Sequence, residues 1–179
     1  MKGGIEIAQN QWLSLKYTHY DNNINTSYVG LRPTQYANRM KGNPAPNDRF
    51  ITQRNAVDLN HSIELSPDTK INTLLYWSKL SRNYWRQSIV NRTQDSTIFR
   101  ACNEGADCLV GRNREFQMLG LDSRINHAYK AFGISNEAEF GIRLHTESQI
   151  NQLVSSKTLA YSGRITSHEE NRANSIAMY

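Results

Sequence analysis

The residues best suited to chemistry lie where one expected element gives way to the next. Arg32 ends a short expected strand and precedes a helix, and Ser66 lies at the next junction of strand and helix. Glu137 and Glu139 form a Glu-x-Glu pair that enters a later strand. A guanidinium group is a planar fork that suits phosphate, and a carboxylate can act as a base or stabilise developing positive charge. The excess of arginine, fourteen against seven lysines, likewise indicates a phosphorylated ligand.

In order along the chain, this layout resembles the mono-ADP-ribosyltransferase toxins and effectors of the cholera and pertussis type. Their pattern is an arginine on an early strand, a Ser-Thr-Ser strand that leads into a helix, and a late Glu-x-Glu. The resemblance implies NAD as cofactor and a protein side chain, possibly arginine, as acceptor. It also implies a bacterial toxin or virulence effector that is secreted or delivered into a host or target cell.

The resemblance implies a role for each of the four residues. Glu139 would bond the ribose 2′-hydroxyl and stabilise the positive charge that develops as nicotinamide leaves. Glu137 would act as general base for the acceptor, Arg32 would hold the pyrophosphate, and Ser66 would orient Glu139.

Each of these residues also has a purely structural interpretation. Glu137 and Glu139 could be two acids that face solvent at the start of a strand. Arg32 could close a surface ion pair worth under about 1 kcal/mol. Ser66, followed by Pro67 and Asp68, has the sequence of a helix N-cap.

A second hypothesis is binding or cleavage of nucleic acid. The middle of the chain is basic, aromatic side chains there could stack on bases, and histidines could serve acid–base catalysis on a phosphodiester. The basic residues are Lys79, Arg82, Arg86, Arg92, Arg100, Arg112 and Arg114, the aromatic ones Trp77, Tyr84 and Trp85, and the histidines His61, His127 and His145.

The two cysteines, Cys102 and Cys108, leave further alternatives open. Two thiols do not make a four-ligand metal site, so no metal is expected. In a chain so poor in cysteine, two reduced thiols are favoured over a loop disulfide. A cysteine nucleophile activated by His127 or His145 is a third hypothesis, beside a non-catalytic interaction protein.

Composition bounds the class of protein. A chain of 179 residues with 38% hydrophobic and 21% charged residues is expected to be one compact domain, 1–179, with a net charge of +5. No apolar run approaches the roughly 20 residues of a membrane-spanning helix, so we expect a soluble protein without a membrane span.

The elements that would position these residues alternate irregularly between strands and helices. Period-two alternation predicts strands over 12–20, 28–31, 57–65, 140–144 and 158–165. Spacing and caps predict helices over 34–41, 67–90, 119–132, 146–154 and from 167 onward, with a proline-rich loop over 42–49. The result is an α+β domain whose mixed, mostly antiparallel sheet is flanked by helices.

The helix over 67–90 carries much of this prediction. Leu74, Trp77, Leu80 and Tyr84 recur at three- and four-residue steps and would form its buried stripe. Lys79, Arg82 and Arg86 would then share another face, either solvated or in contact with phosphate.

Overall fold

The protein folds as one large antiparallel sheet. The structure is a computed structural model that describes residues 1–103 and 105–179. Seven strands follow one another in the order β1-β2-β3-β4-β7-β8-β9, and a separate hairpin, β5-β6, lies in the connection between β4 and β7. The strands are β1 (Lys2–Ala8), β2 (Gln11–Ile24), β3 (Arg49–Ser66), β4 (Thr69–Gln87), β5 (Ile89–Arg92), β6 (Thr97–Phe99), β7 (Leu109–Ala131), β8 (Ile134–Ser156) and β9 (Arg164–Met178).

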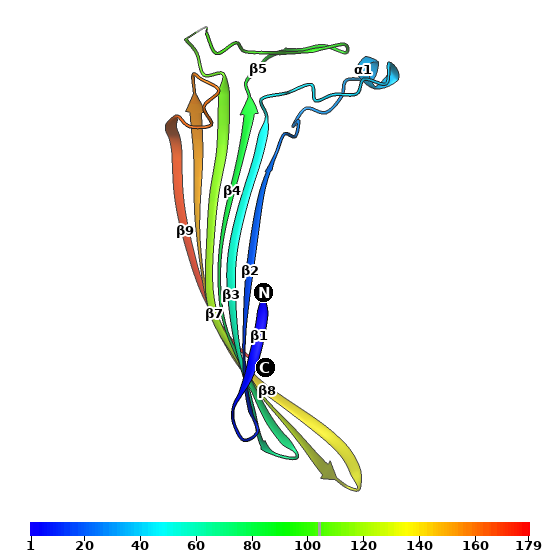
Figure 1. Cartoon of the computed structure of the whole chain (residues 1–179), viewed down its shortest axis with the longest axis vertical. Coiled ribbons are helices and arrows are strands. Elements are labelled where there is room, and N and C mark those ends of the chain that lie inside the picture. Colours follow the sequence, from blue (N-terminus) through cyan, green and yellow to red (C-terminus); the bar gives the residue numbers. More distant parts are fainter. Residues whose placement is uncertain (104) are drawn as a thin grey trace.

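The two ends of the sheet differ. Figure 1 shows a tall, curved sheet with long connections at its upper end, including α1 (Pro33–Ala37) and the β5-β6 hairpin. At the lower end the strands are joined by tight turns. Phe132 and Gly133, which link β7 to β8, both have positive φ (54° and 78°), as the favoured two-residue hairpin turn requires. We call the two ends the loop end and the turn end.

The predicted α+β fold with flanking helices is wrong. In the described part of the chain, the only α-helix is the five-residue α1, and residues predicted as helices over 67–90, 119–132, 146–154 and from 167 onward lie mainly in strands. Pro67 and Asp68 form the two-residue link between β3 and β4, so Ser66 ends a strand instead of capping a helix. Trp77 lies on the face of β4 opposite to Leu74, Leu80 and Tyr84, because β-strand faces alternate with period two.

Other local predictions are closer to the structure. The strands predicted over 12–20, 57–65 and 140–144 lie within β2, β3 and β8, and residues 42–48 form the predicted irregular segment. The helix predicted over 34–41 is confirmed only for its first residues. Residues 28–31 are not a strand, and 158–163 form a connection before β9 begins. Within the described residues, no helix is both long and apolar enough to cross a membrane.

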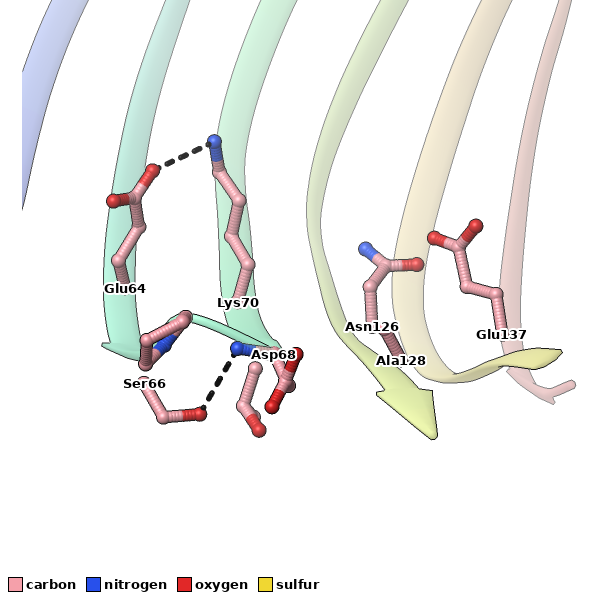
Figure 2. A pocket seen from close by; sticks show the side chains of 9 residues that line it. Glu64, Ser66, Asp68, Lys70, Asn126, Ala128 and Glu137 are labelled. Carbon is pink, nitrogen blue, oxygen red and sulfur yellow. Dashed lines mark hydrogen bonds and ion pairs between the residues drawn. The ribbon is translucent and has the colours of Figure 1, made fainter. Parts of the chain in front are cut away.

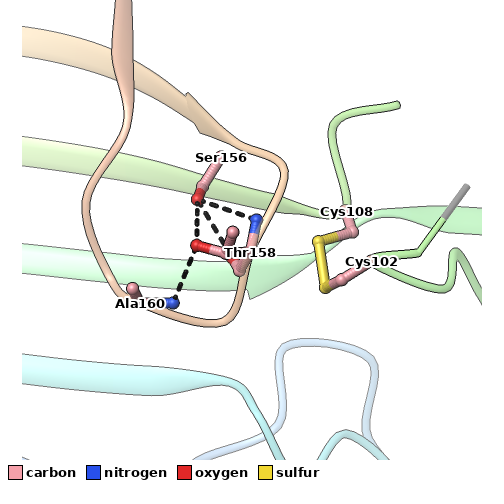
Figure 3. The surroundings of a disulfide bond; sticks show 5 residues. All are labelled: Cys102, Cys108, Ser156, Thr158 and Ala160. Atoms are coloured by element: carbon pink, nitrogen blue, oxygen red, sulfur yellow. Dashed lines mark hydrogen bonds between the residues drawn. A yellow bond between two sulfur atoms is a disulfide. The ribbon is translucent and has the colours of Figure 1, made fainter. Parts of the chain in front are cut away.

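The main cluster of buried apolar side chains lies at the loop end. Trp85, Cys108, Leu109 and Val154 form the buried cluster there, and Leu109 is fully buried. Cys108 forms a disulfide with Cys102, so the expectation of two free thiols is wrong (Figure 3). The rest of the sheet has no second layer to cover it, and many of its large apolar side chains are exposed.

Candidate functional site

The register of the sheet sorts its side chains onto two different faces. Residues that pair across antiparallel strands point to the same face, so a series of pairs defines a row of side chains across the sheet. One row is apolar over six consecutive strands: Leu15, Leu59, Leu75, Leu121, Leu144 and Ile176. We call the face that carries this leucine row the apolar face, and the opposite one the polar face.

The neighbouring rows extend the leucine row into a band on the apolar face. Toward the turn end the next rows contribute Ile5, Leu13, Ile142 and Met178, and then Ile63, Ile71, Ile125 and Phe140. Toward the loop end the next row contains Tyr17, Val57, Trp77 and Leu119. Across these described rows, the apolar face carries no Asp, Glu, Lys or Arg.

The band is bordered by aromatic residues and is exposed. Tyr17 and Trp77 lie at its upper border, and Phe140 and Tyr129 lie toward the turn end. Leu15 is 50% exposed and Ile176 69% exposed, although both lie in the leucine row. Above the Trp77 row the same face turns polar at once, with His19, Asn55, Lys79, Gln117, Ser148 and Arg172 in the next row.

The height of the band can be estimated along β7. The apolar rows run along β7 from Leu119 to Ile125, which is six residue steps or about 20 Å, and a row with Thr69, His127 and Ala138 follows before the aromatic border at Tyr129. From Leu119 to Tyr129 is ten steps, or about 33 Å of strand, and a strand tilt of 35–45° reduces this to a height of about 25 Å. The height of about 25 Å between the two aromatic borders matches the spacing of the aromatic girdles that flank the apolar surface of membrane-spanning strands.

The polar face at the same height carries paired charges. Asp122 is nearly buried and accepts hydrogen bonds from Arg124 Nε (2.8 Å), Arg143 Nε (2.7 Å) and the Tyr179 hydroxyl (3.0 Å). Lys16 Nζ lies 3.2 Å from a carboxylate oxygen of Asp58. Each of these charges therefore has an opposite charge beside it.

The polar face changes character near the loop end. There Arg82, Arg86, Arg112 and Arg114 line a hollow of about 310 Å³ together with Tyr28 and Tyr84. Arg82 pairs directly with Arg114 across β4 and β7, and Tyr84 pairs with Arg112. We call this group of six residues the arginine hollow.

Two contacts hold part of the arginine hollow in place. The guanidinium carbon of Arg86 lies 4.3 Å from the centre of the Tyr28 ring and 5.8 Å from that of Tyr84. Tyr28 is itself held by Asp48, whose Oδ2 accepts a hydrogen bond from the Tyr28 backbone N–H (3.1 Å) and whose Oδ1 accepts one from the Gln87 N–H (2.8 Å). Burial raises the pKa of Asp48 above its ordinary value, although both N–H groups favour the carboxylate.

The structure does not bring together the four residues predicted to form an ADP-ribosyltransferase site. Arg32 lies beside α1 at the loop end, where its Nε donates to the Thr97 hydroxyl (2.9 Å). Ser66 ends β3 at the turn end, and β3 alone is 18 residues long, or about 55 Å. Two of the predicted residues thus lie at opposite ends of the sheet (Figure 1).

The glutamates are nearer to Ser66. Figure 2 shows Ser66 and Glu137 lining one hollow at the turn end, with the Glu64–Lys70 ion pair (3.5 Å) on its wall. Ser66 Oγ accepts a hydrogen bond from the Asp68 N–H (3.3 Å), which stabilises the turn. Glu139 lies on the polar face, where its Oε1 is 3.6 Å from Arg124 Nη1.

The prediction of a shared basic face is also revised. Arg82 and Arg86 share the polar face of β4, but Lys79 lies on the opposite face and forms an ion pair with Glu115 (2.8 Å). The sequence analysis named the four arginines and Tyr84 among its basic and aromatic residues, but it did not predict that they converge, because two of the arginines, Arg112 and Arg114, come from another strand. One signal was present in the sequence: Arg82 and Arg86 are four residues apart, and Arg112 and Arg114 are two apart. An even spacing places both arginines of a strand on the same face.

Comparison with known proteins identifies the fold. No protein-family model matches the sequence, and comparison with curated proteins finds no match. Two crystal structures of the ferric-catecholate import receptor Fiu from Escherichia coli K12 are similar to this chain, both at 14% identity. The closed form has a TM-score of 0.65 and covers 94% of this chain, and the open form has a TM-score of 0.69 and covers 99%.

The likeness concerns the fold alone and part of the receptor. This chain spans 29% of the closed-form chain and 32% of the open-form chain. Neither comparison bears on ADP-ribosyl transfer or on nucleic-acid binding, so both stay predictions from the sequence.

Proposed function

We propose that this sheet forms part of the membrane-spanning wall of an import receptor. The apolar face contacts lipid and the polar face lines a water-filled interior. The leucine row and its neighbours carry this proposal, because an exposed band without a single Asp, Glu, Lys or Arg needs an apolar surrounding. Such alternation contains no long apolar run, which is why the sequence led to the expectation of a soluble protein.

The position of the disulfide supports the orientation of the sheet. Cys102 and Cys108 lie in the connection at the loop end, and disulfides persist in oxidising surroundings. We infer that the loop end faces an oxidising compartment outside the cytosol. The strands continue well beyond the Trp77 row in this direction, so the loop end projects from the lipid and can meet a ligand in water.

Both edge strands of the sheet need a pairing partner in the membrane. β1 and β9 each pair on one side only, and both are exposed along their whole length. Open sheet edges do not occur in the hydrocarbon layer, because unpaired N–H and C=O groups cost several kcal/mol each there. In the membrane, each edge therefore pairs with a further antiparallel strand.

Beyond its place in the membrane, we propose that the sheet serves import. It is supported by the fold shared with a protein described as a ferric-catecholate import receptor and by a polar face that stays charged through the band. A sheet that only anchored a protein would not need a nearly buried carboxylate, Asp122, paired with the partly exposed Arg124 and Arg143 on its inner face.

Two adjacent leucines test the placement in the membrane. Leu75 belongs to the leucine row, whereas Leu74 pairs with Asp122 on the polar face. A nitroxide at Leu75→Cys should collide with oxygen dissolved in lipid, and one at Leu74→Cys with a water-soluble nickel chelate. Equal accessibility of the two labels in the membrane-reconstituted protein would contradict the proposal.

A further inference from the structure

None of the four arginines of the arginine hollow forms an ion pair with a carboxylate in the described part of the chain. Asp48 interacts electrostatically with Arg86 without forming an ion pair, and its two oxygens accept the N–H bonds of Tyr28 and Gln87. In residues 1–103 and 105–179, no Asp or Glu lies within salt-bridge distance of Arg82, Arg86, Arg112 or Arg114. Arg86 Nε is buried and has no hydrogen-bond partner in the described part of the chain. This contrasts with the paired arginines around Asp122 on the same face.

The close approach of these positive charges destabilises the sheet unless an anion neutralises them. Arg82 and Arg114 are direct cross-strand partners, and like charges in this position destabilise a sheet. The neighbouring Asn151 accepts from Arg114 Nε at 3.2 Å, but an amide oxygen carries no net negative charge. Four convergent guanidinium groups around an open hollow therefore have the chemistry of an anion site.

The position of the hollow distinguishes the possible sources of the anion. Its four arginines and Tyr84 lie on the polar face, and Arg82 is five residues beyond Trp77, or about 16 Å farther along the strand from the band. A lipid headgroup at the upper border would meet the other face, near Tyr17 and Trp77. The geometry favours an anion that arrives through water.

We propose that the arginine hollow binds a compact, water-soluble polyanion that carries at least two carboxylate or phosphate groups. This inference deepens the proposed function, on which it rests for the view that the polar face lines the import path. A volume of about 310 Å³ suits a small molecule, and guanidinium forks pair with such groups through two parallel hydrogen bonds. The rings of Tyr28 and Tyr84 also line the hollow and lie against the guanidinium group of Arg86.

The proposed anion binding can be tested by calorimetric titration of the full protein in detergent, once with citrate and once with pyrophosphate. Binding of either probe at constant ionic strength is expected, and the stronger one identifies the group as carboxylate or phosphate. Arg82→Gln and Arg112→Gln should each weaken binding about 10- to 100-fold, the loss expected for charge-assisted hydrogen bonds. Dihexanoyl phosphatidylglycerol should not compete; competition would instead assign the hollow to lipid headgroups.

Arg172→Gln is the matched control. It removes the same charge from β9 at the level of Lys79, but on the opposite face of the sheet. Its affinity should equal that of the unsubstituted protein. Equal weakening by Arg172→Gln and Arg82→Gln, or no binding of either probe to correctly folded protein, overturns the inference. If the nitroxide at Leu75→Cys contacts lipid but neither anion binds, the anion site is overturned and the proposed membrane placement remains intact.

Discussion

Gly120 lies directly opposite Tyr76, and the tyrosine ring covers it so closely that a Cβ on Gly120 would clash with the ring and its hydroxyl oxygen. The ring is also fixed from the other side, because the hydroxyl lies 2.9 Å from His145 Nδ1. The glycine therefore provides the space that lets Tyr76 lie flat on the polar face between β7 and β8.

This contact predicts that Gly120→Ala is destabilising. The ring must move away from its site and lose the His145 contact, and overpacking of this kind costs about 1–3 kcal/mol. Denaturant unfolding of the protein in lipid or detergent measures the change. Gly3→Ala is the control, because a Cβ there meets nothing within 4 Å. Equal stability of the two variants would show that Tyr76 is not fixed over Gly120.

A charge should be tolerated on one face of β2 and not on the other. Leu15 lies in the leucine row and Ser14, its neighbour, on the polar face. Leu15→Arg is expected to cost about 2–4 kcal/mol, the penalty of a cation near the middle of the hydrocarbon layer. Ser14→Arg should change the free energy of unfolding by no more than about 0.5 kcal/mol. Similar costs for both substitutions would argue against a lipid-facing side.

Asp48 is expected to hold the connection that carries Tyr28. Its side chain is 2% exposed and accepts N–H bonds from Tyr28 and Gln87 through different oxygens. Asp48→Asn replaces one acceptor by a donor, which leaves a buried N–H unpaired at a cost of about 1–3 kcal/mol. Amide hydrogen exchange should accelerate at Tyr28 or Gln87, whereas Asp95→Asn, at an exposed site, should leave both unchanged. Unaltered exchange in Asp48→Asn would remove this role.

Reduction of the disulfide should loosen only the loop end. Cys108 is tied to the sheet, since its N–H donates to the Ser156 carbonyl (2.9 Å) and its carbonyl accepts from the Ser88 N–H (2.9 Å). Cys102 has no such backbone anchor in the described part, so the bond to Cys108 holds it in place (Figure 3). Hydrogen exchange under reducing conditions should rise around Cys102 and stay constant in the leucine row. A rise in both regions would mean that the disulfide supports the whole sheet.

The sequence could predict strands only where alternation stands out against a polar background. Leu13, Leu15 and Tyr17 alternate with polar residues, and the strand predicted there is confirmed within β2. In β4 the polar face also contains Leu74, Leu80 and Tyr84, so large side chains lie on both faces of this strand. Together with Trp77 on the apolar face, they recur at steps of three and four residues, which imitates a helix.

The candidate site depends on register, which single-strand patterns do not reveal. Nothing in the segment around Arg82 indicates that Arg114 lies opposite it, since β4 and β7 are separated by a long connection. The leucine row likewise exists only once six strands are aligned. The disulfide could be named only as one of two possibilities, because spacing alone does not fix the distance between Cys102 and Cys108.

A scan of nitroxide accessibility along β7 tests the central claim most directly. Single cysteines placed in turn from Glu115 to Ile125 report contact with lipid through oxygen and contact with water through a nickel chelate. The account predicts period-two oscillation, with lipid contact at Leu119, Leu121, Ser123 and Ile125, water contact at the residues between them, and no lipid contact at Glu115 or Gln117. Uniform water accessibility along the whole strand in the membrane-reconstituted protein would contradict it.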